Sequence, residues 1–216
     1  MTEFNLLKSF PKINREHLIG TRTEENRTIA RKFNKEFFDG ERINGYGGYN
    51  YDGRWIEVAK LIQKRYKLEP GDTLLDVGCA KGFLITDCYN FSVIDAYGID
   101  ISEYAINNCI NGFKPRLIIG DAKNLPYADK SFSCVISINT IHNLNLEDCK
   151  KAIREMIRVC KTPKKMFIQV DAFRNIDEYE RMKSFNLTAK TILHVDDWLK
   201  LFKEVGYKGD YYFTII

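Results

Sequence analysis

The chain has 216 residues, and its 44% hydrophobic content can bury one sizeable core but leaves little material for a second full domain. Its 33 lysines and arginines are interleaved with 29 acidic residues, which favours solvated helix faces over a concentrated nucleic-acid-binding surface. No apolar run approaches the roughly 20 residues of a membrane span, and the N-terminus lacks the apolar centre of a signal peptide. We therefore expect a cytoplasmic protein with no membrane span and no nucleic-acid partner.

The cysteines also favour a reducing, cytoplasmic setting. None belongs to a C-x-x-C pair, and most lie in apolar segments, where a thiol behaves as a small hydrophobic side chain. We therefore expect neither a disulfide framework nor a zinc site. The six residues are Cys79, Cys88, Cys109, Cys134, Cys149 and Cys160.

The first 54 residues precede the regular part of the pattern. Residues 23–38 predict one charged helix, and it leads into INGYGGYNYDG (43–53), which holds four glycines and three tyrosines. We expect residues 1–54 to form a helix and a Gly/Tyr-rich lid segment. Residues 55–216 are expected to form the core, within a single domain overall.

From residue 54 onward, helix-like and strand-like segments alternate. The apolar spacing predicts a helix at 54–67, which the sequence LEPG ends, and the run TLLDVG (73–78) is typical of a buried strand. A helix at 82–89 and a strand at 96–101 follow. Ser102 is the expected N-cap of the next helix, and strands are predicted at 116–122 and 131–139. A helix at 147–160 and a strand at 164–173 follow. The last elements are a helix at 196–205, with Asp196 as its expected N-cap, and a strand at 209–216.

This alternation predicts an α/β fold, with a doubly wound, mostly parallel Rossmann-like sheet and helices on both faces. In such a sheet, ligands bind beyond the C-terminal ends of the strands. The loop DVGCAKG (76–82) lies there, between a strand and a helix, whereas no strand precedes the glycines of 43–53. A dinucleotide fingerprint is disfavoured because Ala80 and Phe83 occupy two of its glycine positions.

Three blocks of sequence then resemble the class I S-adenosylmethionine-dependent methyltransferases, over roughly residues 55–210. LLDVGCAKGF is similar to the family's first motif, with Ala80 replacing the middle glycine, and YGIDIS is similar to its second. GDAKNLPYADKSFSCVIS is similar to the third block. The blocks look most like the broad small-molecule group, type 11.

The resemblance implies S-adenosyl-L-methionine as cofactor and S-adenosyl-L-homocysteine as product. Asp76 would orient the loop and the cofactor's amino acid part, and Asp100 would accept bonds from both ribose hydroxyls. Asp121 and the backbone around Ala122 would take the adenine, with Ile101 and Leu125 on its faces. The full set of expected cofactor-binding residues is Asp76, Gly78, Cys79, Ala80, Gly82, Asp100, Ile101, Asp121, Ala122, Leu125 and Asn139.

The chemistry needs mainly alignment, because a sulfonium methyl is already electrophilic. No metal is expected, since the sequence INTIHNL after the fourth strand lacks clustered acids. If the acceptor is a hydroxyl, His142 is the candidate base; the alternative is a histidine that hydrogen-bonds backbone and shapes the pocket. His194 and His17 are weaker candidates.

The acceptor is expected to be an oxygen or nitrogen of a small molecule, with a sugar or phosphate-type intermediate of surface-polysaccharide biosynthesis as one option. The alternatives are an RNA or protein methyltransferase, a non-catalytic cofactor-binding partner or sensor, and a dehydrogenase. Residues of the Gly/Tyr-rich segment are candidates for substrate contact, although a loop packed on the core explains them equally well. They are Arg42, Tyr46, Tyr49, Tyr51 and Arg54.

The end of the sheet departs from the family pattern, which normally has two strands after the last helix, one of them antiparallel. Here only GDYYFTII (209–216) remains. Either the edge is short, or LTAKTILH (187–194) supplies a strand. A homodimer contact at this edge is plausible, so both a monomer and a homodimer stay open.

Overall fold

A computed structural model describes residues 1–11 and 16–216; residues 12–15 of the expected N-terminal segment lie outside the described part. Within that part, a seven-stranded sheet has the order β3-β2-β1-β4-β5-β6, and β7 also pairs with β5. The pairings recorded between these strands are all parallel. The strands are β1 (Thr73–Val77), β2 (Asp95–Asp100), β3 (Leu117–Ile119), β4 (Cys134–Ile138), β5 (Met166–Phe173), β6 (Leu193–His194) and β7 (Asp210–Thr214).

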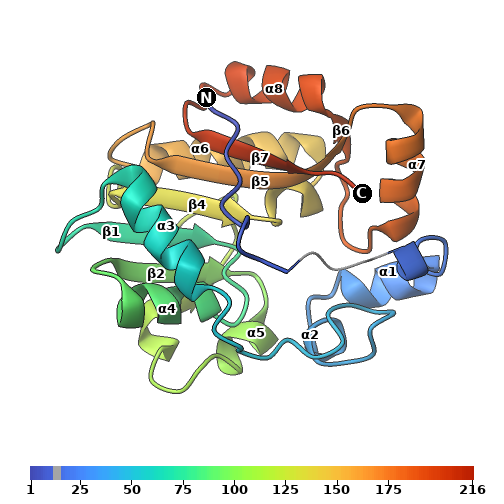
Figure 1. Cartoon of the computed structure of the whole chain (residues 1–216), viewed down its shortest axis with the longest axis horizontal. Coiled ribbons are helices and arrows are strands. Elements are labelled where there is room, and N and C mark those ends of the chain that lie inside the picture. The colour runs from blue at the N-terminus through green and yellow to red at the C-terminus, as the bar shows by residue number, and fades with distance from the viewer. Residues whose placement is uncertain (12–15) are drawn as a thin grey trace.

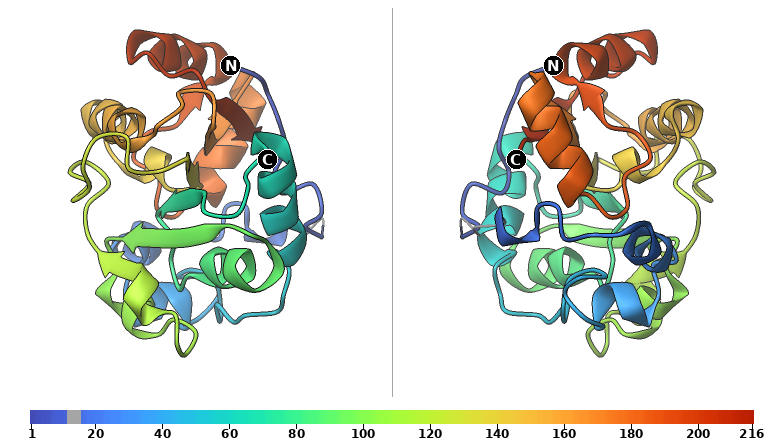
Figure 2. Two further views of the ribbon diagram at one scale, coloured as in Figure 1. Left: turned by 90° about the vertical axis from the view of Figure 1, so that its left-hand side faces the viewer. Right: turned by 90° about the vertical axis from the view of Figure 1, so that its right-hand side faces the viewer.

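Helices cover both faces of this sheet, as Figures 1 and 2 show. On one face α3 (Ile56–Tyr66), α4 (Phe83–Phe91) and α5 (Glu103–Asn107) pack through side chains such as Ile62 and Ile85. On the other face α6 (Leu146–Val159) and α8 (Val195–Glu204) bury Met156 and Trp198 against β4 and β5. The predicted fold class, a mostly parallel Rossmann-like sheet, is therefore confirmed.

The remaining helices lie mainly around the C-terminal edge of the sheet. No helix in the described ranges is long and apolar enough to cross a membrane. These elements are α1 (Glu24–Ala30), α2 (Lys35–Phe38), α7 (Ile176–Phe185) and the short 3-10 turns η1 (Glu16–Leu18), η2 (Lys114–Arg116) and η3 (Ile141–Asn143).

Two local predictions were wrong. The single helix expected over residues 23–38 is split, because Phe33 has a φ of 47° and the Asn34 side chain then caps α2 by accepting the Glu36 N–H. The N-cap of α8 is His194 and not Asp196. The imidazole of His194 accepts the backbone N–H of Asp196 at 3.2 Å, so the expected cap residue donates the capping bond.

The structure shows how the sheet ends after the last helix, where the sequence departs from the family pattern. β7 pairs in parallel with β5, from Phe167 opposite Asp210 to Asp171 opposite Thr214, and the 187–194 segment supplies only the two residues of β6. The far side of β7 is covered by the N-terminal residues. The Phe4 N–H donates to the Tyr211 carbonyl at 2.8 Å, and the Tyr211 N–H donates to the carbonyl of residue 2 at 3.0 Å.

Candidate active site

The loop between β1 and α4 brings backbone amides to the C-terminal edge of the sheet. The N–H groups of Gly78 and Cys79 donate to the Ile99 carbonyl at 2.8 and 3.1 Å and hold the loop against β2. Gly78 has a φ of 90°, and a Cβ there would lie 2.0 Å from Oγ1 of Thr140, so only glycine fits. Ala80, which replaces the family's middle glycine, has a φ of 50° and therefore retains local strain.

Asp76 places a buried carboxylate beside this loop. The residue is 6% exposed, and its Oδ1 has no hydrogen-bond partner among the described residues. Burial, and after it the nearby Asp100 carboxylate, raise the pKa of Asp76 to about 7. A buried acceptor without a partner is costly, so a ligand group that donates hydrogen bonds or carries positive charge would relieve that cost.

Asp100 lies at the end of β2 and is held by two backbone amides. Its Oδ2 accepts the Ala80 N–H and its Oδ1 accepts the Ser102 N–H, both at 2.8 Å. Burial raises the pKa of Asp100, and the two hydrogen bonds oppose that rise. Each oxygen has a second lone pair, so the carboxylate can still accept bonds from ligand hydroxyls. The adjacent Ile101 is 57% exposed and offers an apolar surface.

The expected adenine-binding residues differ in how open they are. Asp121 Oδ1 accepts the Lys123 N–H at 2.9 Å, and its Oδ2 lies 3.4 Å from Lys123 Nζ. Both carboxylate oxygens therefore already have a partner within the local turn. Ala122 is half-buried. Leu125 is 3% exposed and belongs to the core. Of the two residues expected to enclose the adenine, only Ile101 therefore presents a large apolar surface.

Three further predicted residues support the loop through packing or backbone geometry. Cys79 is buried, and its Sγ would lie 2.6 Å from a Cβ at Gly98. Gly82 has a φ of 71°, and a Cβ there would lie 2.7 Å from Leu117. Asn139 has a φ of 54° immediately after β4, and its backbone N–H donates to the Gln169 carbonyl at 3.0 Å.

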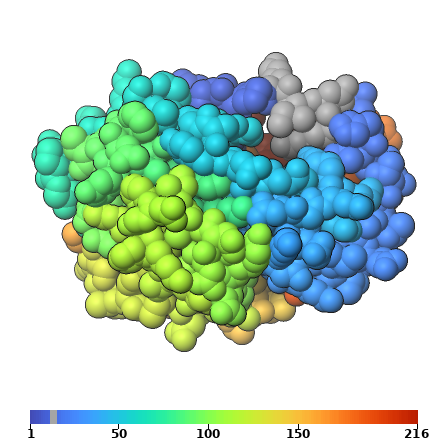
Figure 3. Space-filling view, turned by 90° about the horizontal axis from the view of Figure 1, so that it is seen from below, coloured from blue at the N-terminus to red at the C-terminus, as the bar shows by residue number. Residues whose placement is uncertain are grey.

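An ion pair joins the N-terminal segment to the cofactor loop. Nζ of Lys81 lies 2.8 and 2.6 Å from the two carboxylate oxygens of Asp39, and it also donates to the Tyr49 carbonyl at 3.0 Å. The hydroxyl of Tyr104 adds a bond to Asp39 at 2.7 Å. Burial alone would raise the pKa of Asp39, but the bonds from Lys81 and Tyr104 outweigh it and the pKa is lowered. Figure 3 shows the blue and cyan residues of this segment against the green residues around α4 and α5.

The three candidate tyrosines lie in that same segment. The Tyr49 ring stacks on Phe83, the first residue of α4, with ring centroids 4.8 Å apart, and the Tyr46 ring lies 4.4 Å from that of Tyr49. The Tyr51 hydroxyl donates to the buried Asp87 of α4. Two of the three tyrosines therefore contact the helix that follows the loop.

The two candidate arginines are engaged within their own segment. Arg54 Nε lies 2.9 and 2.8 Å from the two oxygens of Asp52, and Arg42 donates to the Gly45 carbonyl. The charge of Arg54 is therefore balanced before any ligand binds.

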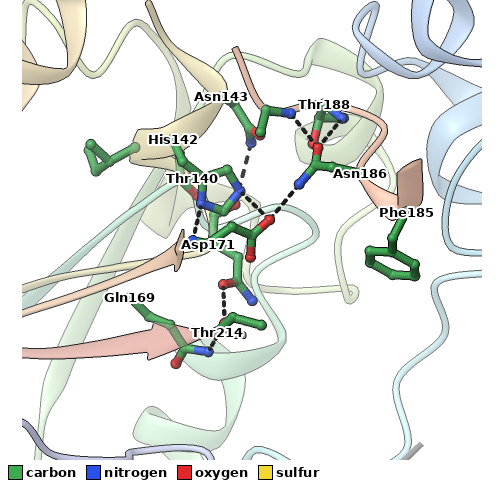
Figure 4. Close-up of polar contacts among 12 residues, drawn as sticks. Thr140, His142, Asn143, Gln169, Asp171, Phe185, Asn186, Thr188 and Thr214 are labelled. Atoms are coloured by element: carbon green, nitrogen blue, oxygen red, sulfur yellow. Dashed lines mark hydrogen bonds and ion pairs between the residues drawn. The ribbon is translucent and has the colours of Figure 1, made fainter. Parts of the chain in front are cut away.

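His142 lies past β4, on η3, in a dense hydrogen-bond network (Figure 4). It is 3% exposed, its Nδ1 accepts the Asp171 N–H at 3.0 Å, and its Nε2 lies 3.5 Å from Oδ2 of Asp171. Asn186 donates to the same Asp171 oxygen. Burial lowers the pKa of His142 against the opposing effect of Asp171. The neutral ring therefore carries its proton on Nε2, with the Nδ1 lone pair already in use.

The sequence reasoning missed Asp39, Lys81 and Asp171. Lys81 was visible inside the DVGCAKG motif, just before a helix of apolar residues, and a lysine buried there requires a partner. Nothing local identifies that partner, because Asp39 is distant in sequence. Asp171 was visible only as an acid within an apolar strand.

The strand order and the loop after β1 have the arrangement of a nucleotide-cofactor enzyme, and a comparison with protein-family models specifies which kind. Residues 75–168 match a model described as a methyltransferase domain. Residues 75–168 therefore form a methyltransferase domain of the S-adenosylmethionine-dependent kind. A methyltransferase domain is what the three sequence blocks predicted, and its presence sets aside the dehydrogenase alternative.

Relatives of the methyltransferase domain act on chemically different acceptors. A tRNA (carboxymethyluridine(34)-5-O)-methyltransferase of Arabidopsis thaliana is 32% identical over 68% of this chain and 34% of that protein. A norajmaline N-methyltransferase of Rauvolfia serpentina is 33% identical over 48% of this chain and 37% of that protein. The chain spans about a third of the length of these two curated relatives.

A solved structure shows the same methyltransferase fold. It is a Haloferax volcanii complex of the Trm112 methyltransferase activator with a candidate methyltransferase, and the matched chain aligns with a TM-score of 0.57 at 22% identity. The alignment covers 68% of this chain and 66% of that chain. At this identity the similarity supports the fold alone.

Proposed function

We propose that this methyltransferase domain transfers the methyl group of S-adenosylmethionine to an oxygen or nitrogen of a small molecule, releasing S-adenosylhomocysteine. The observation that carries the proposal is the buried Asp76 Oδ1, which lacks a partner in the described part of the chain. It lies beside a loop of backbone amides, where a cationic amino group would supply both hydrogen bonds and charge compensation.

The residues present fit this cofactor. Asp76 would hold its amino group, Asp100 its ribose hydroxyls and Ile101 one face of its adenine, while the Gly78–Gly82 loop positions them. When bound, S-adenosylmethionine supplies a methyl group that is already electrophilic. The protein then has to orient the acceptor and exclude water, which supports catalysis by positioning.

The hydrogen bonds of His142 fit a residue that positions the chain better than they fit a general base. Its Nδ1 accepts the Asp171 N–H, and its carbonyl accepts the N–H groups of Lys190 and Thr191 at 3.0 Å each. A neutral ring with Nδ1 bonded and Nε2 protonated has no lone pair left to receive a proton. We infer that His142 fixes the 186–191 segment around the acceptor site and that the acceptor reacts without help from this imidazole.

We assign residues 16–54 of the N-terminal segment a covering role over residues 55–216, with Tyr46, Tyr49, Tyr51, Arg42 and Arg54 near the acceptor. The ion pair of Asp39 with Lys81 supports this assignment. The six free thiols favour a cytoplasmic setting. Among small molecules, sugar or phosphate-type intermediates of surface-polysaccharide biosynthesis are the acceptors to test first, and both a monomer and a homodimer remain to be tested.

RNA is the second candidate acceptor. The Arabidopsis thaliana relative, which is named for its action on tRNA, matches 68% of this chain, more than the alkaloid-modifying relative does. The spread of positive charge along the sequence argues against RNA.

The test is calorimetric titration with S-adenosylmethionine and S-adenosylhomocysteine, followed by incubation with methyl-labelled cofactor. The wild-type protein should bind both compounds, and Asp76→Ala should lose most of that binding while remaining folded. The label should enter a small-molecule extract. Label in total tRNA would favour the second candidate, binding without transfer to any acceptor would indicate a non-catalytic protein, and absence of binding would refute the proposal.

A further inference from the structure

Four uncharged polar residues form a hydrogen-bonded chain from the middle of β5 to the ends of β4 and β7. Gln169 Nε2 donates to Thr214 Oγ1 at 3.0 Å, and the Thr214 hydroxyl donates to Asn139 Oδ1 at 3.4 Å. Asn143 Nδ2 donates to the Asn139 backbone carbonyl at 3.3 Å. Figure 4 shows Gln169 beside Thr214, with Asn143 farther away, near His142. We call Gln169, Thr214, Asn139 and Asn143 the polar chain.

The polar chain leaves two buried oxygens unused. Oε1 of Gln169 and Oδ1 of Asn143 have no hydrogen-bond partner within residues 1–11 and 16–216, and Gln169 is 4% exposed. Thr214 gives its one proton to Asn139 and accepts from Gln169, which leaves Gln169 Oε1 unused. A backbone carbonyl can only accept, so Asn143 must donate to it through Nδ2, which leaves its Oδ1 unused. Both unused atoms are therefore hydrogen-bond acceptors.

The polar chain lies next to the cofactor site. Gln169 is in register with Ile138, the last residue of β4, and Thr140 is packed against Gly78 of the cofactor loop. Its members carry no formal charge, and the ionisable group beside them on β5 is the acid Asp171.

We infer that the methyl acceptor is an uncharged polyol or amino-polyol, such as a sugar ring, that donates hydrogen bonds to Gln169 Oε1 and Asn143 Oδ1. This inference rests on the proposed function and names the substrate class of the same site. An apolar ring system would leave both oxygens buried and unpaired. A phosphate would place its negative charge against acceptor oxygens and near Asp171. A site built to pair hydroxyl or amine groups therefore rejects both alternatives.

The experiment compares Gln169→Met and Asn143→Leu with wild type and with a matched control, Ser133→Ala. Ser133 is a buried polar residue just before β4, at the opposite end of that strand. The probes are free hexoses and amino sugars, a sugar phosphate, an indole alkaloid and a sterol, with methyl-labelled cofactor. S-adenosylhomocysteine affinity is measured by calorimetry on every variant, and folding by urea denaturation.

We expect methyl transfer to a hexose or amino sugar in the wild type, with KM raised at least tenfold in Gln169→Met and in Asn143→Leu. The affinity for S-adenosylhomocysteine should stay within twofold of wild type, and Ser133→Ala should leave KM unchanged. Using two variants keeps the test decisive if one of them does not fold.

The inference is overturned if the alkaloid, the sterol or the sugar phosphate is the preferred acceptor, or if both folded variants keep the wild-type KM. It is also overturned if a crystal structure with acceptor bound shows only a water molecule on Gln169 Oε1. Each of these results leaves S-adenosylhomocysteine binding intact. Loss of that binding in the wild type would instead refute the proposed function, and this inference with it.

Discussion

Ala80, in the loop after β1, and Asp76, in β1 itself, are each in a conformation or environment that lowers the stability of the folded protein. Ala80 has a φ of 50°, which costs an L-residue roughly 1–2 kcal/mol. Asp76 keeps a carboxylate out of water, and its Oδ1 finds no partner among the residues described. Such states persist where the surrounding structure enforces them, and they are common at binding sites. Each can be relieved by one substitution.

Asp76→Asn should stabilise the ligand-free protein, and more so at higher pH. The folded-state pKa of about 7 is above the ordinary value of 3.8, so ionisation of Asp76 opposes folding above about pH 4 and its full cost is reached above pH 7. The gain from Asn should therefore grow by about 2–3 kcal/mol between pH 5 and pH 8. Urea denaturation at the two pH values measures it; a gain that is equal at both pH values would contradict the assigned burial cost.

Ala80→Gly should leave the free energy of unfolding unchanged or raise it by up to about 1 kcal/mol. The relief of left-handed strain is offset in part by the greater freedom of glycine in the unfolded chain. Ala80→Val is the matched comparison and should be clearly destabilising, because a β-branched residue tolerates positive φ poorly. Thermal denaturation compares the two; a stable valine variant would show that the loop can change its conformation.

At the scale of elements, the mostly buried ion pair of Asp39 with Lys81 joins the N-terminal segment to the cofactor loop. Lys81→Met should cost about 3–5 kcal/mol, because Asp39 then keeps its charge with only the Tyr49 N–H and the Tyr104 hydroxyl as partners. Asp39→Asn combined with Lys81→Met should recover part of that loss. Chemical denaturation of the single and double variants gives the coupling energy, and a coupling near zero would mean that the segment is not anchored there.

The tyrosines of the Gly/Tyr-rich segment test whether it takes part in the reaction. Tyr49→Ala removes the ring stacked on Phe83, and Tyr51→Ala removes the hydroxyl bonded to Asp87. Each should lower kcat/KM at least about tenfold under conditions where the variant remains folded, because the segment covers the site. Steady-state kinetics alongside circular dichroism measures this. If kinetics are unchanged in both variants, the segment serves only packing.

At the scale of the whole molecule, the first residues belong to the core and not to a movable cover. Leu6 is fully buried in the same cluster as Ile62 and Phe167. Leu6→Ala should therefore cost about 2–5 kcal/mol, whereas Leu7→Ala, a partly exposed neighbour, should cost clearly less. Equal losses in urea denaturation would mean that residues 1–11 leave the sheet readily.

The central alternation and the cofactor loop were predictable because they depend on local signals. Apolar runs mark β1 and β4, and DVGCAKG lies where a strand meets a helix. The break at Phe33 was not predictable, because a non-glycine residue with positive φ leaves no local mark. The pairing of Asp39 with Lys81, the hydrogen bonds of His142 and the parallel addition of β7 all depend on partners far away in sequence.

The pairing of residues 2–4 with β7 also has a consequence for synthesis. Phe4 is synthesised some 200 residues before its partner Tyr211, a delay of roughly 10–40 seconds at usual elongation rates. During that interval Leu6 and its apolar neighbours have no finished sheet edge to cover. We expect this closure to be a late step in the folding of the sheet, and the nascent chain to be more prone to chaperone binding and aggregation until it occurs.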